Sequence, residues 1–143
     1  MKRLAVLAIA GASLAACATP PPPPPPPPAG PITFRLVTLA GRAPAFDGVT
    51  ITLDGARANG STGCNTYLAL RDSAPNAARP LAWFQITEVA CSDVQMALER
   101  QWLETLDNTR AVETAGSELV LKDAAGTELA RMVRGPAPAP AGS

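Results

Sequence analysis

The chain has 143 residues, 16 of them proline, and its twelve lysine and arginine residues balance twelve aspartate and glutamate residues. It contains no histidine, which removes the usual general base, the usual partner of a catalytic serine or cysteine, and the commonest zinc ligand. The balanced charge gives no basic field for nucleic acid. We therefore expect no catalytic residue, no metal, no cofactor and no nucleic-acid partner.

Residues 1–16 have the composition of an export signal. Lys2 and Arg3 precede an apolar run from Leu4 to Ala16, and small residues close this run. The run is too short to cross a bilayer as a helix, which needs about 20 residues. Its ending, Leu14-Ala15-Ala16-Cys17, resembles a bacterial lipobox.

The lipobox resemblance implies that Cys17 carries diacylglycerol, that the peptide before it is removed, and that the new N-terminus is acylated. Two or more acyl chains give a stable membrane anchor. The residue after the cysteine is Ala18 and not aspartate, which in a Gram-negative cell resembles a sorting signal for the outer membrane. The alternative is an ordinary signal peptide cut near Ala16 or Ala18, with Cys17 incidental.

Nine consecutive prolines, Pro20 to Pro28, dominate the segment 17–31 that follows. Each proline lacks an amide donor and has a fixed φ, so the tract is excluded from helices and central strands. We expect a polyproline II spacer of about 28 Å, at about 3.1 Å per residue, which holds the next domain off the membrane. The alternative is a ligand for a proline-reading domain.

Residues 32–134 are enough for one small domain, and the proline- and alanine-rich tail 135–143 is expected to be disordered. Most of the domain has the two-residue alternation of β-strands. The expected strands are 34–39, 49–53, 64–70, 81–87, 118–122 and 128–132. Asp54-Gly55 predicts one hairpin turn and Gly126 another, whereas 59–63 is expected to be a glycine-rich bend and 72–80 a loop.

One segment has helical periodicity instead. Ser92 and Gln95 have the spacing of a capping box at a helix N-terminus. An apolar stripe follows at four-residue spacing, formed by Val94, Leu98, Trp102 and Leu106 and widened by Ala97 and Leu103. The sequence therefore predicts one helix of about four turns that ends near Asn108, and we expect Trp83 and Trp102 in the core.

Cys64 and Cys91 remain as a pair once Cys17 is assigned to lipid. An exported, oxidising location favours a disulfide between them. Closing this loop would stabilise the fold by about 3.5 kcal/mol in the chain-entropy model. The alternatives are two free buried thiols or one reactive thiol.

Short motifs recur along the domain in a recognisable order. They are Gly63-Cys64-Asn65 with Tyr67, Thr87 with Ala90-Cys91, Glu99 with Trp102 and Leu106, Leu119-Val120-Leu121, and Gly126 with Leu129. Together they resemble the META domain, the fold of the HslJ-like heat-shock proteins, over residues 34–132. The resemblance implies a mainly β (α+β) fold, a compact antiparallel barrel-like sheet with one packed α-helix. It also implies a setting of heat-shock or envelope stress, and it supplies no catalytic residue.

Four polar residues of these motifs are candidate structural or ligand contacts. Glu99 falls at the edge of the helix's apolar stripe, where a carboxylate needs partners such as an arginine or backbone amides, and we expect it to make a structural hydrogen bond or ion pair that joins the helix to the sheet. Asn65 is expected to form the turn, and Thr87 to bond to backbone where a strand ends. Tyr67 completes the set, and contact with a ligand is the alternative for each residue.

These features predict a lipid-anchored envelope protein that faces the periplasm, with the membrane as one partner through its lipid. Its non-catalytic domain would bind an unknown envelope protein. One alternative is a carrier that holds a small apolar ligand in the mouth of the barrel. A third hypothesis is a thiol-redox protein that uses Cys64 and Cys91.

Overall fold

The computed structural model describes residues 30–135. The predicted signal peptide, Cys17, the proline tract and the tail from residue 136 lie outside the described residues. The elements are β1 (Ile32–Leu39), β2 (Thr50–Asp54), β3 (Arg57–Ser61), β4 (Thr66–Arg71), β5 (Leu81–Ile86), α1 (Asp93–Asn108), β6 (Ala111–Ala115), β7 (Glu118–Lys122) and β8 (Glu128–Arg134). Within this range, no helix is long and apolar enough to span a bilayer.

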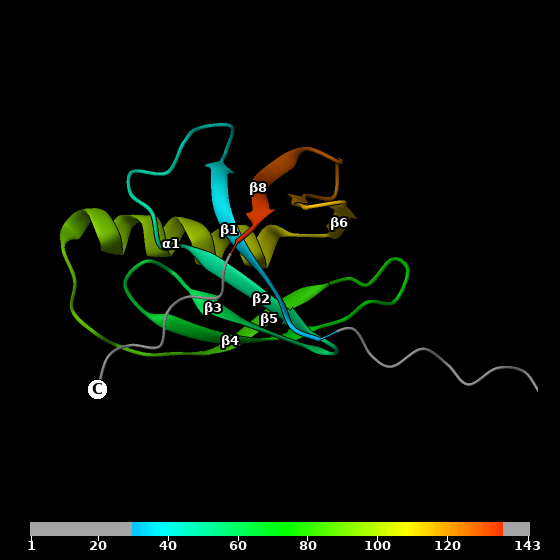
Figure 1. Ribbon diagram of the computed structural model, residues 1–143, viewed down its shortest axis with the longest axis horizontal. Helices are drawn as coiled ribbons and strands as arrows, with labels where there is room; N and C mark the ends of the chain where they lie inside the picture. Colours follow the sequence, from blue (N-terminus) through cyan, green and yellow to red (C-terminus); the bar gives the residue numbers. More distant parts are fainter. Residues whose placement is uncertain (1–29, 136–143) are drawn as a thin grey trace, which may run out of the picture.

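All eight strands form one antiparallel sheet in the order β5-β4-β3-β2-β1-β8-β7-β6. The sheet curls into a half-barrel, and β5 and β6 remain as its two edges. In Figure 1, helix α1 crosses above the layer formed by β2 to β5, with β8 and β6 beside it. The predicted class, mainly β with one packed helix, is confirmed, and the sheet is open rather than a closed barrel.

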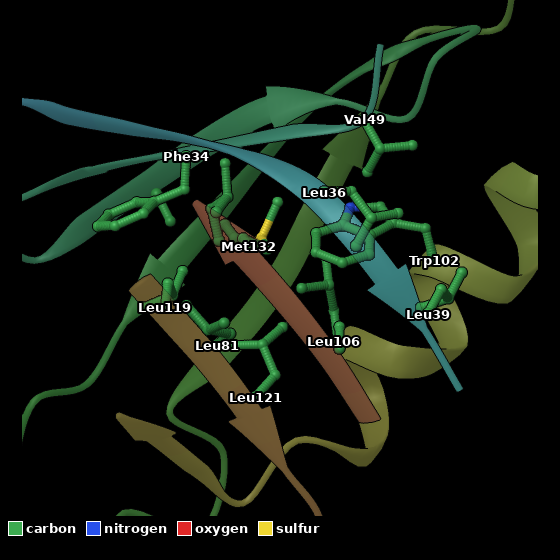
Figure 2. Close-up of a cluster of buried hydrophobic side chains, with 14 of the residues drawn as sticks. Phe34, Leu36, Leu39, Val49, Leu81, Trp102, Leu106, Leu119, Leu121 and Met132 are labelled. Carbon is green, nitrogen blue, oxygen red and sulfur yellow. The ribbon is translucent and has the colours of Figure 1, made fainter. Parts of the chain in front are cut away.

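The core fills the concave side of the sheet. Figure 2 shows side chains from β1, β5, β7, β8 and α1 converging on one cluster, with Trp102 and Leu106 of the helix among the strand residues. Trp102 is fully buried, as predicted, whereas Trp83 is half-buried and packs against the cluster. Burial of these apolar side chains is the main force that holds the helix to the sheet.

Strand β3 corrects the predicted glycine-rich bend at 59–63. Residues 57–59 pair with β2 on one side, residues 57–61 pair with β4 on the other, and only 62–65 turn. Gly60 is needed there for close approach, because a β-carbon would collide with the carbonyl oxygen of Thr50 and the hydroxyl of Tyr67. The prediction took this glycine for a turn residue.

The helix begins and ends as predicted, but its buried face is rotated from the predicted stripe. The capping box of Ser92 and Gln95 is present, and the helix ends at Asn108. Val94 and Ala97 are exposed, whereas the buried residues are Leu98, Glu99, Trp102, Thr105 and Leu106. A spacing of four residues advances by about 40° per step around a helix, so a stripe that includes Val94 drifts off the sheet.

Strand β6 was not predicted. It is an edge strand in which no residue is fully buried, so its alternation of apolar and polar residues is weak. It forms through a five-residue register with β7, from Ala111 opposite Lys122 to Ala115 opposite Glu118. Pairing with a neighbour, and not a local pattern, therefore defines this strand.

Candidate functional site

A disulfide joins the turn before β4 to the segment before α1. Cys64 and Cys91 are bonded, with their Cα atoms 6.0 Å apart. The predicted pairing is confirmed, and the two free-thiol alternatives are not what the structure has. The bond fixes residues 87–91, which have no regular secondary structure, against the turn at 62–65.

The turn at 62–65 is organised by Thr62 and Gly63. The Thr62 hydroxyl accepts hydrogen bonds from the amides of Cys64 and Asn65, at 3.3 and 2.9 Å. Gly63 has φ +86°, and a β-carbon there would collide with the ring of Phe46. Glycine is therefore required both for the left-handed conformation and for the packing of Phe46.

Asn65 is the centre of a buried polar network. Its Oδ1 accepts from the Val89 amide at 2.7 Å and from the Thr87 hydroxyl at 2.9 Å. Its Nδ2 donates to Oε2 of Glu99 at 2.9 Å and to the carbonyl of Val89 at 3.3 Å. One amide side chain therefore connects the turn, the segment after β5 and the helix, whereas the sequence predicts that it forms the turn itself, which the Thr62 hydroxyl does instead.

Glu99 is the helix's contribution to this network. The Thr62 hydroxyl donates to Oε2 of Glu99 at 2.6 Å, beside the bond from Asn65. The predicted hydrogen bond between helix and sheet is present, but its donors are a hydroxyl and an amide side chain: in the range 30–135, Glu99 has no arginine or lysine in salt-bridge contact. Gln95 adds a second tie from the helix, because its Nε2 donates to the Gly63 carbonyl at 3.2 Å.

Thr87 and Tyr67 have different surroundings. The Thr87 hydroxyl accepts from the Thr66 amide at 3.1 Å, which confirms the predicted bond to backbone. Tyr67 lies on the inner face of β4, outside the network, and its hydroxyl donates to the Thr50 carbonyl at 3.0 Å. Burial raises the pKa of the Tyr67 hydroxyl above its usual range, and the nearby Trp102 indole opposes that rise in part.

The structure therefore brings together five of the six predicted residues of the domain and leaves Tyr67 in the core. The donors and acceptors of the network point at one another, so the network ties α1 and the 87–91 segment to the sheet. In the part of the chain that the structure describes, no group of three or more His, Cys, Asp or Glu side chains is placed to hold a metal ion.

A surface that the sequence prediction missed lies on the other side of the sheet. We call the solvent-facing side of β2, β3, β4 and β5 the outer face. Three large apolar side chains are exposed on it: Leu68 at 41%, Leu70 at 58% and Phe84 at 59%. They surround a hollow of about 420 Å³ whose other side-chain neighbours include Thr52, Asp54, Arg57 and Asn59. We call this the outer-face hollow, and its size falls in the usual range for ligand sites.

The sequence does carry a signal for the outer-face hollow. Tyr67-Leu68-Ala69-Leu70 is apolar at four consecutive positions, so strand β4 is apolar on both sides. Tyr67 and Ala69 face the core, and Leu68 and Leu70 face solvent. A strand with solvent on one side normally alternates apolar and polar residues, so this departure indicates a surface that something covers.

The domain is mainly β and has a single core, formed by an open half-barrel and one helix. A disulfide holds the segment before the helix to the sheet, and a buried polar network holds the helix itself. The family model of the META domain matches residues 31–135, so the chain belongs to the META domain family. No match was found among the curated proteins or the solved structures.

Proposed function

We propose that the chain is a lipid-anchored protein of the bacterial envelope, held at the outer membrane and facing the periplasm. In this proposal its META domain binds an envelope partner without catalysis, in a setting of heat-shock or envelope stress. The single observation that carries the binding role is the outer-face hollow with Leu68, Leu70 and Phe84 exposed around it. Exposed apolar patches of this kind mark interaction sites, because apolar side chains that stay in contact with water do not stabilise the folded domain.

Anchoring at Cys17 is supported by the Leu14-Ala15-Ala16-Cys17 sequence that ends the export signal. Cys17→Ser removes the thiol that would carry the lipid, and we expect it to move the protein from the membrane fraction to the soluble periplasmic fraction. Membrane association that is unchanged in Cys17→Ser would contradict lipidation at this residue. This experiment tests the anchor alone and does not depend on what the domain binds.

Binding at the outer face is tested with two matched variants. Phe84→Ser removes the most exposed aromatic ring of the hollow, and Val94→Ser removes a side chain of similar exposure, 57%, that does not line it. Both changes are on the surface and should alter stability by less than about 0.5 kcal/mol. After crosslinking in intact envelopes, we expect a partner captured by the wild type and by Val94→Ser to be lost from Phe84→Ser. Equal capture by both variants would exclude the outer-face hollow as the site.

The packing of the concave side argues against a carrier that holds its ligand inside the sheet, and so favours the protein-binding role. Side chains fill that side, among them the fully buried Trp102, Leu81, Leu119 and Met132. An apolar ligand would instead have to occupy the outer-face hollow. Native mass spectrometry of protein taken from membranes separates the two classes of occupant. A bound small molecule appears as a small added mass on the chain, whereas a protein partner gives no small added mass.

A further inference from the structure

The outer-face hollow combines apolar side chains with hydrogen-bond donors that have no partner among residues 30–135. Leu68, Leu70 and Phe84 supply the apolar surface. Arg57 and Asn59 lie on the same face of β3 and also line the hollow. Among the described residues, neither the guanidinium of Arg57 nor the amide of Asn59 makes a side-chain hydrogen bond or an ion pair.

This chemistry fits a particular class of ligand, one that is apolar and accepts hydrogen bonds without donating any. Polyproline has these properties, because each residue has a carbonyl acceptor and an apolar ring but no amide hydrogen. Proline-rich segments in the polyproline II conformation dock on exposed aromatic side chains in shallow grooves, at a low cost in conformational entropy. An ordinary extended peptide would bring one amide donor per residue and would need acceptors, of which Asp54 is the one charged example at the hollow.

The chain itself contains such a segment close to the hollow. The nine prolines end at Pro28, two residues before Gly30, where the described structure begins. β1 starts at Ile32, which is opposite Leu53 on β2. The next residue of β2, Asp54, is opposite Arg57, and Arg57 is opposite Leu70. Strand β1 therefore starts level with the end of the hollow that Asp54, Arg57 and Leu70 form.

The length of the tract is sufficient to cover the hollow. From β1 to β4 is three strand spacings, or about 14 Å, and to β5 about 19 Å. The nine prolines extend over about 28 Å as polyproline II. The chain needs one turn between the tract and β1, and Gly30 is placed for it, since it is exposed and a β-carbon there would meet open space.

We propose that the tract Pro20–Pro28 folds back over the outer face and occupies the outer-face hollow of the same chain. The rings of the prolines contact Leu70 and Phe84, and their carbonyls accept hydrogen bonds from Arg57 and Asn59. The proposal rests on the binding role of the outer-face hollow and adds its regulation, because an outside partner must displace the tract. A tract that is drawn out by its membrane anchor would leave the hollow open.

The test measures how fast hydroxyl radicals oxidise Phe84, Leu68 and Leu70 in the purified full chain carrying Cys17→Ser. The comparison chain has the nine prolines replaced by alternating glycine and serine. With an effective concentration of about 1 mM for a tethered segment, a site that binds the free tract with a Kd of about 0.25 mM is about 80% occupied. We therefore expect oxidation at Phe84 to be about fivefold slower with the proline tract. Val94 should be oxidised equally in both chains.

A second variant separates docking from an indirect effect. Phe84→Ser with the prolines intact should remove the protection of Leu68 and Leu70. The protection should also be independent of protein concentration between about 1 and 100 μM, because the tract and the hollow belong to one chain. Equal oxidation with and without the prolines would overturn the proposal, and so would protection that appears only at the higher concentration, which would assign the hollow to the tract of a second copy. No partner is present in this experiment, so its failure would leave partner capture by the outer face as a separate question.

Discussion

The hydrogen bond between Asn65 and Glu99 can be tested by exchanging its donor and its acceptor. Nδ2 of Asn65 donates to Oε2 of Glu99 over 2.9 Å, and only 3% and 7% of the two residues is exposed. Asn65→Asp preserves the oxygen that accepts from Thr87 and Val89, but it replaces the donor by a second carboxylate oxygen. Two carboxylates would then face each other in a buried site, where like charges repel strongly.

The sizes of the effects follow from the burial of the pair. A hydrogen bond to a charged group is worth about 1.5–3 kcal/mol, and we expect a loss of at least this size in Asn65→Asp, because the donor is removed and a second carboxylate takes its place. Glu99→Gln retains an acceptor for Asn65 and exchanges charge-assisted bonds for neutral ones, so we expect a loss of about 1–2 kcal/mol. In the double variant Asn65→Asp/Glu99→Gln, the new amide can donate to the new carboxylate. The double variant should therefore be more stable than the sum of the single losses predicts, by at least about 1.5 kcal/mol.

The assay is urea unfolding with the disulfide intact, followed by tryptophan fluorescence, because Trp102 is fully buried in the folded domain. Glu104→Gln is the matched control, since Glu104 is exposed on the same helix, and its effect should stay below about 0.5 kcal/mol. Losses that simply add in the double variant would refute the direct bond. An unfolding midpoint that Glu99→Gln leaves unchanged would refute the structural role of this carboxylate.

Three further predictions concern the disulfide, the sheet and the core. Replacing Cys64 and Cys91 by alanine together should lower the free energy of unfolding by about 2–4 kcal/mol in urea titrations, and no change would show that the bond constrains nothing. Gly60→Ala should cost about 2–3 kcal/mol because of the collision with Thr50, whereas Gly30→Ala, which meets open space, should cost less than about 0.5 kcal/mol; similar losses would contradict the close approach. Tyr67 is the single tyrosine of the sequence, and burial raises its pKa, so stability should be complete below about pH 10 and fall as the pH rises above that value. Tyrosinate absorbance should then appear together with unfolding, and tyrosinate in the folded protein near pH 10 would contradict the burial of the hydroxyl.

Those parts of the fold that depend on local chemistry were predictable from the sequence. The capping box of Ser92 and Gln95 fixes the start of the helix within one turn of chain, and the hairpin at Gly55 is encoded by two adjacent residues. The disulfide followed from the number of cysteines and the expected oxidising location. In each case the signal and the structure that it produces lie close together in sequence or concern few residues.

The parts that were missed depend on contacts between distant segments. The partners of Glu99 come from residues 34 and 37 positions away, so nothing near the helix indicates a hydroxyl and an amide. β6 is an edge strand that its pairing with β7 creates. Gly60 has the sequence signal of a turn residue, but its role is to admit the carbonyl of Thr50, which the sequence does not place beside it. The outer-face hollow was visible in part, as apolar residues on both faces of β4, but its shape requires four strands in register.

The central claim is that the outer-face hollow is where this domain binds. The most direct measurement is photocrosslinking in intact envelopes, with p-benzoylphenylalanine placed in turn at Phe84, at Leu70 and at Val94. All three positions are similarly exposed, at 57–59%, but only the first two line the hollow. The account predicts adducts, within the chain or to a partner, from positions 84 and 70 and none from position 94. Adducts of equal yield from all three positions, or adducts from position 94 alone, would contradict it.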